Sequence, residues 1–189
     1  MQSNTFFGGS NPFNSSNSVV TSLDLESADD LFAASWIQSS QVSGFDMSKQ
    51  TVAPADFQAA ATQEGANSRV ITAVSYNAGQ VVYLSYGWQS DTSTIYETQV
   101  ATASLETAAT VAANLAAQGY IVTAIGGSDL SDSFLLVGTR VQGDTMPRPF
   151  AIASEIAGTS AYTVLMQPGY AMVDVLQDAQ GNLTFLGER

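Results

Sequence analysis

Apolar segments recur along this chain at intervals of about fifty residues. The best-matched pairs are 119–125 with 169–175 and 134–140 with 183–189. These two copies start 50 residues apart; an earlier copy in 71–74 lies 51 residues before 122–125, and a fainter one in 20–23 lies 51 residues before 71–74. Periods of this size are typical of arrays whose units bury a core only by stacking on their neighbours. The sequence therefore predicts three to four pseudo-repeats.

Each predicted unit contains one helix followed by three strands. A short helix is expected over 54–64, closing at Gly65. The next helix has Ser104 as its N-cap and a single apolar stripe, and Gly119 suits the left-handed residue just past its end. Pro168 precedes Gly169, so a third helix is expected either to stop earlier or to distort.

The first copy requires a choice between two structures. Segments 19–25 and 31–37 have the pattern of a hairpin, and a third strand is expected around 45–47. Ser27 and Asp30 also fit a helix capping box, which would make the second segment helical. Alignment with the later copies favours a strand.

The turns complete the predicted fold class. Glycine-containing turns are expected at 77–79 and 178–182, and Gly126 with Gly127 is expected to start a longer loop. Strands that are apolar on both sides, such as 134–137, fit a sheet with helices on one face. The prediction is an α+β protein, with a curved antiparallel sheet and helices on one face.

Residues 1–17 differ in composition from the rest. They are mainly Asn, Ser and Gly, which predicts a flexible polar leader before a single repeat domain over 18–189. Such a tether often follows a cleaved secretory or lipoprotein signal, so we expect a periplasmic or extracellular protein, with a lipid anchor in the case of a lipoprotein signal. A disordered end of a cytoplasmic protein is the alternative.

The composition excludes several kinds of chemistry. The chain has no Cys and no His, so thiolate nucleophiles, disulfides and histidine-dependent catalysis or metal binding are excluded. Its net charge of −12, with a single Lys, opposes binding to nucleic acids. No apolar run approaches the roughly 18 residues that a transmembrane helix needs. We expect no cofactor, no metal and no transmembrane segment.

The repeated unit resembles the bacterial tandem repeat domain family. The residues that carry the resemblance are Phe57-Gln58-Ala59-Ala60, Gly65, Val70-Ile71, Tyr76, Gly79, Tyr83 and Trp88. The later units depart from the pattern, since they have Val141 or the chain end in place of Trp. The resemblance implies repeats found in exported proteins, sometimes beside hydrolase domains, without chemistry of their own.

Carboxylates are the only numerous acid–base groups. Asp129 and Asp132 share a predicted loop, and Asp144 lies near Arg148. A glycosidase-like hydrolase needs two carboxylates facing each other across a cleft, although Asp is also an ordinary turn residue. Segments 129–132 and 178–182 offer oxygen ligands to calcium but match no known loop spacing.

Four aromatic residues at predicted strand ends are candidate ligand-binding residues: Trp36, Tyr86, Trp88 and Tyr96. Exposed rings on a rigid sheet bind sugars or a partner protein, whereas buried rings at these positions are core residues. The first functional hypothesis is a non-catalytic repeat module that presents a sheet surface to a protein or glycan. The alternatives are a carboxylate-based hydrolase and a structural subunit of a larger assembly.

Overall fold

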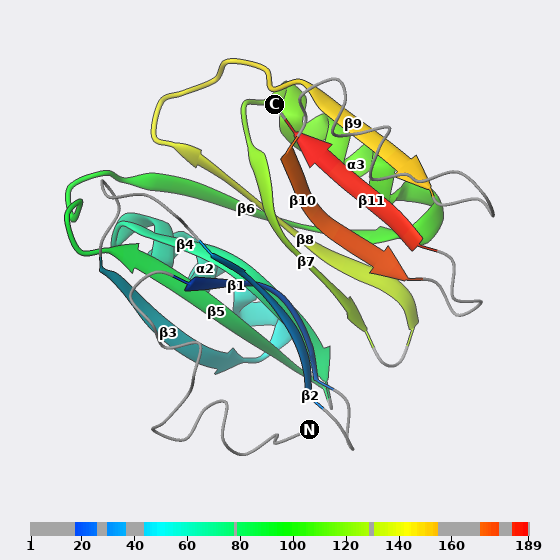
Figure 1. Cartoon of the computed structure of the whole chain (residues 1–189), viewed down its shortest axis with the longest axis horizontal. Coiled ribbons are helices and arrows are strands. Elements are labelled where there is room, and N and C mark those ends of the chain that lie inside the picture. The colour runs from blue at the N-terminus through cyan, green and yellow to red at the C-terminus, as the bar shows by residue number, and fades with distance from the viewer. Residues whose placement is uncertain are drawn as a thin grey trace.

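The chain is an α+β protein in a computed structural model, shown in Figure 1. The structure describes residues 18–25, 30–36, 44–77, 79–128, 131–154, 171–177 and 183–188. In chain order the elements are β1 (Ser18–Leu25), β2 (Asp30–Trp36), β3 (Phe45–Val52), the 3-10 turn η1 (Pro54–Asp56), α2 (Phe57–Ala66), β4 (Arg69–Asn77), β5 (Gln80–Trp88), β6 (Tyr96–Ser104), α3 (Leu105–Ala117), β7 (Ile121–Ser128), β8 (Ser131–Val141), β9 (Phe150–Ser154), β10 (Ala171–Gln177) and β11 (Leu183–Glu188). The predicted strand over 31–37 is confirmed as β2, and the helical alternative is wrong.

The largest sheet has the strand order β3-β5-β4-β7-β8-β6. It consists of two antiparallel three-stranded halves, β3-β5-β4 and β7-β8-β6, which meet where Tyr76 and Ser128 pair in parallel. Gly126 lies at this junction within β7, so the loop predicted to start there is wrong. A Cβ at Gly126 would overlap the backbone carbonyl of Val74, and the absence of a side chain allows the two halves to approach.

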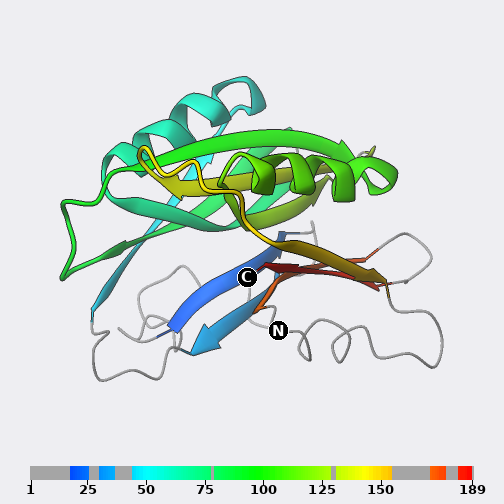
Figure 2. The same ribbon diagram turned by 90° about the horizontal axis from the view of Figure 1, so that it is seen from above.

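The two described helices lie on the side of the molecule away from β1–β2 and β9–β11 (Figure 2). Phe57 and Ala61 of α2 are buried in the same cluster as Val137 of β8, whereas the neighbouring residue Leu136 is buried with α3. Since adjacent strand residues point to opposite faces, α2 lies between the two halves and α3 on the far face of the second. The expected arrangement, in which the helices lie on one face of a single sheet, is therefore wrong.

Each of the four hairpins in the described part of the chain contains a shift in register near the start of its first strand. The shifts lie between Val20 and Ser22, Ile71 and Ala73, Val122 and Ala124, and Met172 and Asp174. In β4 this bulge leaves Thr72 without a partner, so Ile71 and Val74, three residues apart, are buried in the same cluster. In three of these hairpins the second strand also pairs with the strand that precedes the hairpin in the chain: β5 with β3, β8 with β6 and β11 with β9.

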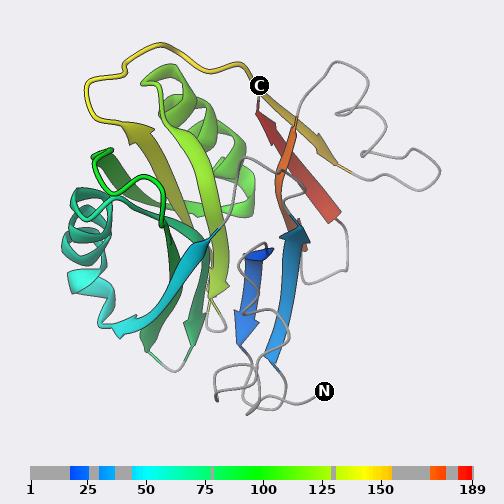
Figure 3. The same cartoon turned by 60° about the vertical axis from the view of Figure 1, so that its left-hand side comes forward.

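A second layer of strands covers the other side of the large sheet. The β1–β2 hairpin lies beside the three-stranded sheet β10-β11-β9 (Figure 3). Val19, Val20 and Leu23 of β1 are buried against Ala73 and Leu84 of the first half. The backbone of Val20 also donates a hydrogen bond to the Tyr86 hydroxyl at 3.0 Å.

The helix ends show which local predictions succeed. Helix α3 begins after Ser104 as predicted, and its end has Gly119 at φ 87° with Tyr120 N donating to Leu115 O at 3.0 Å, which is a Schellman motif. Helix α2 continues past Gly65 to Ala66, so the predicted helix end is wrong. Gly65 instead allows the β6 backbone to approach, because a Cβ there would overlap Tyr96 O.

Some predictions fall outside the described residues. These are the leader over 1–17, the third helix before Pro168 and the turn at 178–182. In the part of the chain that is described, no helix has the length and apolarity required to cross a membrane.

Candidate functional site

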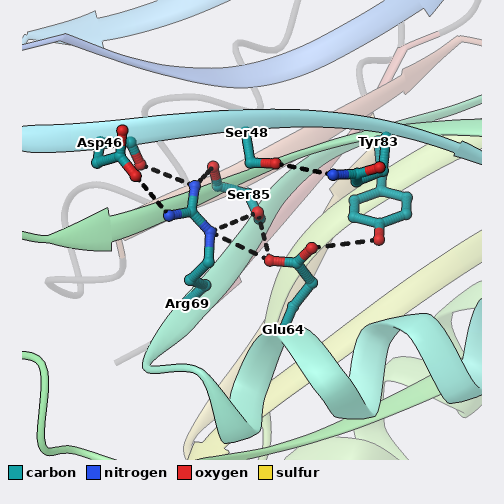
Figure 4. Close-up of polar contacts among 7 residues, drawn as sticks. Asp46, Ser48, Glu64, Arg69, Tyr83 and Ser85 are labelled. Carbon is teal, nitrogen blue, oxygen red and sulfur yellow. Dashed lines mark hydrogen bonds and ion pairs between the residues drawn. The ribbon is translucent and has the colours of Figure 1, made fainter.

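A polar cluster, buried except for one exposed carboxylate, lies where the end of α2 meets β3, β4 and β5 (Figure 4). We call it the Glu64 cluster, and its members are Asp46, Glu64, Arg69, Tyr83 and Ser85. Glu64 belongs to the buried face of α2, which also contains Phe57 and Ala61 at helical spacing. Arg69 is the first residue of β4, only five positions later, because the chain turns sharply through Ser68, whose φ is 61°.

Glu64 accepts contacts from three neighbouring side chains. The Ser85 hydroxyl donates to Oε2 at 2.7 Å, the Tyr83 hydroxyl donates to Oε1 at 3.3 Å, and Nε of Arg69 lies 3.1 Å from Oε2. Burial, followed by the negative charge of Glu64, raises the pKa of Tyr83 to about 12. The carboxylate is thus held by protein donors on both oxygens.

The guanidinium of Arg69 directs its donors into the protein. Nε donates to Ser85 Oγ at 3.0 Å, Nη1 donates to Asp46 Oδ2 at 2.8 Å, and Nη2 donates to the backbone carbonyls of Asp46 and Ser85 at 2.9 and 2.8 Å. The group lies over Gly87, where a Cβ would be 3.1 Å from Nη1. Four of its five N–H groups are therefore engaged with the protein.

A surface pocket of about 360 Å³ adjoins the cluster at the end of β5. Its lining residues are Asp46, Asn67, Ser68, Arg69, Gly87, Trp88, Gln89, Asp91 and Thr92. Glu64, Tyr83 and Ser85 do not reach it. Only the outer members of the Glu64 cluster, Asp46 and Arg69, therefore face the pocket, whose lining is both polar and apolar.

Asp91 fixes the turn that forms one wall of this pocket. Its carboxylate accepts hydrogen bonds from the Ser93 and Thr94 backbone amides and from both of their hydroxyls. These hydrogen bonds, the Thr94 hydroxyl foremost, lower the pKa of Asp91 to about 2. Asp91 is therefore ionised at any physiological pH.

No known family model matches the sequence, and neither a curated protein nor a solved structure matches it significantly.

The four aromatic residues predicted to bind a ligand lie in different settings. Tyr86 is a core side chain, only 6% exposed, and its hydroxyl is bonded to β1. Trp88 lines the pocket and stacks on Phe45 with ring centroids 6.3 Å apart, while its Nε1 is buried without a hydrogen-bond partner. Tyr96 is half-buried at the start of β6, and burial, with the charge of Asp91 second, raises its pKa. Trp36 lies in β2, and its side chain is outside the described part.

The carboxylates predicted as catalytic candidates do not come together in the described part of the chain. Asp144 forms an ion pair with Arg148, as their proximity in sequence suggests. Asp129 and the side chain of Asp132 lie outside the described residues, as does 178–182. Within the residues that the structure places, no group of three acidic side chains is arranged to hold a metal ion.

The sequence analysis missed the Glu64 cluster. One signal was present: Glu64 falls three residues after Ala61 and seven after Phe57, on the face that the helix buries. A carboxylate on a buried face requires partners. The partners themselves come from other strands, so local spacing does not identify them.

Proposed function

We propose that this chain is a non-catalytic repeat module of an exported protein and that it binds a protein partner. The observation that carries the proposal is that the buried carboxylate, Glu64, is held by protein groups and closed to substrate.

The four register shifts support the repeat. Their positions are spaced by 51, 51 and 50 residues, the same intervals as the recurring apolar segments. An apolar residue precedes each bulge, and β5, β8 and β11 each pair with the strand that ends the preceding unit. We therefore propose four units, with the resemblance to the bacterial tandem repeat domain family as their suggested origin and export as the suggested setting.

The Glu64 cluster argues against a carboxylate-based hydrolase. A glycosidase requires its two carboxylates to face each other across a space that holds the substrate. Here the guanidinium of Arg69 occupies the space between Glu64 and Asp46. Ser85, the hydroxyl nearest to Glu64, is fully buried and does not line the pocket. A nucleophile without access cannot attack a substrate.

The aromatic residues favour a protein over a glycan as partner. Sugar rings bind to the exposed faces of aromatic side chains. Tyr83, Tyr86 and Tyr120 are buried, and Trp88 packs against Phe45. Four large aliphatic side chains, in contrast, are exposed among the described residues: Ile95, Ile121, Val141 and Met146. Exposed aliphatic residues that adjoin one another mark protein contacts, whereas isolated ones are ordinary on a protein surface.

A display experiment tests the proposed function. The full chain is immobilised, and a random peptide library and a panel of oligosaccharides are selected on it in parallel. We expect enrichment of a peptide motif and no retained oligosaccharide. Retention of sugars alone, hydrolysis of any glycoside in the panel, or the absence of any enriched ligand together with a closed oligomer in light scattering would each refute the proposal.

A further inference from the structure

The pocket beside the Glu64 cluster has an acidic lining. Three charged side chains line it: Asp46, Asp91 and Arg69. Two of them are acidic and one is basic. The Asp46 side chain is 68% exposed, and the pKa of Asp91 lies near 2. This net negative charge repels anions and attracts cations.

Arg69 does not offset this preference. Although it lines the pocket, its donors point to Ser85, Glu64 and Asp46, and its side chain is only 15% exposed. An anionic ligand would have to displace these contacts. The remaining polar lining, from Asn67, Ser68, Gln89 and Thr92, consists of uncharged groups that provide hydrogen-bond acceptors as well as donors.

The volume restricts what enters. At about 360 Å³ the pocket is at the small end of the range for ligand sites. It accommodates one long side chain rather than an extended oligosaccharide or a folded element. A lysine or arginine side chain combines this size with the required charge.

Exposed apolar residues lie beside the pocket. Ile95 follows the Asp91 turn, and its carbonyl accepts a hydrogen bond from Gln142 N at 2.9 Å. Val141 is paired with Tyr96, and Ile121 is paired with Thr139, two residues along the same strand. Asp91 is close enough to Tyr96 for its charge to act on the hydroxyl. The pocket and these apolar residues therefore occupy one end of the molecule.

We infer that this end is the docking surface for a peptide segment of the partner, with a basic side chain in the pocket and an adjacent aliphatic residue against Ile95 and Val141. The inference rests on the proposed function and specifies the partner. The net charge of the whole chain, −12, adds a long-range attraction to such a segment.

The test uses two capped tetrapeptides, Gly-Arg-Leu-Val and its neutral analogue Gly-Gln-Leu-Val, titrated into the full-length ¹⁵N-labelled chain. We expect the arginine peptide to shift the amides of Gly87, Gln89, Asp91 and Thr92 and those of Ile95 and Val141. The neutral analogue should bind about tenfold more weakly, which corresponds to a difference of about 1.4 kcal/mol. Salt should weaken binding of the arginine peptide and leave that of its analogue unchanged.

Variants then locate the charge effect. Asp46→Asn should weaken binding of the arginine peptide at least fivefold and leave that of the neutral analogue unchanged. Asp56→Asn is the matched control, because Asp56 is exposed and lies outside the pocket. Equal affinities for the two peptides, equal effects of the two variants, or shifts that map to another surface would overturn the inference. In the last case a peptide still binds, so the proposed function stands; if no peptide binds anywhere and display enriches none, the function itself fails.

Discussion

Replacing Glu64 with Ala measures what the Glu64 cluster contributes to stability. The substitution removes the acceptor of Ser85 Oγ at 2.7 Å and of Tyr83 at 3.3 Å, and it breaks the ion pair with Arg69 Nε at 3.1 Å. A hydrogen bond to a charged group contributes about 1.5–3 kcal/mol, and breaking a buried ion pair costs about 3–5 kcal/mol. Arg69 keeps Asp46 and two carbonyl partners, so we expect the lower end, a loss of about 3 kcal/mol.

Urea unfolding followed by circular dichroism checks this value, and the slope against urea should not change. For a chain of this size, the loss corresponds to a decrease in melting temperature of about 6–12 °C. Gln63→Ala is the matched control, since Gln63 is exposed one residue earlier in α2, and its effect should be below about 0.5 kcal/mol. If Glu64→Ala is no more destabilising than this control, the cluster is not a stabilising unit and the reasoning is refuted.

Three other substitutions test the contacts between elements. Gly126→Ala should destabilise the protein by about 2–3 kcal/mol in thermal unfolding, because its Cβ would meet the backbone of Val74, whereas Gly127→Ala, with only a side chain near, should have little effect. Gln58→Ala should accelerate hydrogen exchange at the amide of Val100, because the side-chain amide of Gln58 accepts a hydrogen bond from Val100 N at 2.8 Å and donates one to Thr98 O at 3.0 Å. Unchanged exchange would show that β6 does not depend on α2. Tyr83→Phe should remove part of the loss of stability at alkaline pH. The pKa of Tyr83 in the folded protein, about 12, exceeds the usual value of 10, so the wild-type protein should lose stability relative to the variant as pH rises from 10 to 12. Parallel pH profiles of stability for the two proteins would contradict this.

Structure determined by neighbouring residues was predictable. The start of α3 at Ser104 depends on a capping residue, and its end depends on Gly119 and the return of Tyr120 to Leu115, all within one segment. The strands of the first copy followed from the repeat, which outweighed a capping pattern at Ser27 and Asp30.

Glycine illustrates where sequence reasoning failed. Gly65 and Gly126 were assigned to a helix end and a loop, because glycine commonly occupies such positions. Both lie inside regular elements, and each accommodates the backbone of a strand distant in sequence. Nothing near these residues in the chain encodes that approach.

The candidate site was less predictable than the fold. Asp46, Arg69 and Ser85 come from three strands, and only the sheet order β3-β5-β4 brings them to Glu64. Tyr86 and Trp88 have similar positions in sequence, yet only Trp88 lines the pocket. Both side chains point to the same face of β5, and Trp88 reaches the pocket because it ends the strand, which composition does not reveal.

The bulge at Thr72 makes this one position of β4 tolerant of a change in chain length. Deleting Thr72 would join Ile71 to Ala73 and restore simple alternation, and Ile71, Ala73 and Val74 would keep both their cross-strand partners and their present faces. Deleting a paired residue such as Val74 would instead turn the residues on one side of the gap to the opposite face of the sheet. The loss of a single residue is therefore absorbed at the bulge and not at the paired positions of the strand.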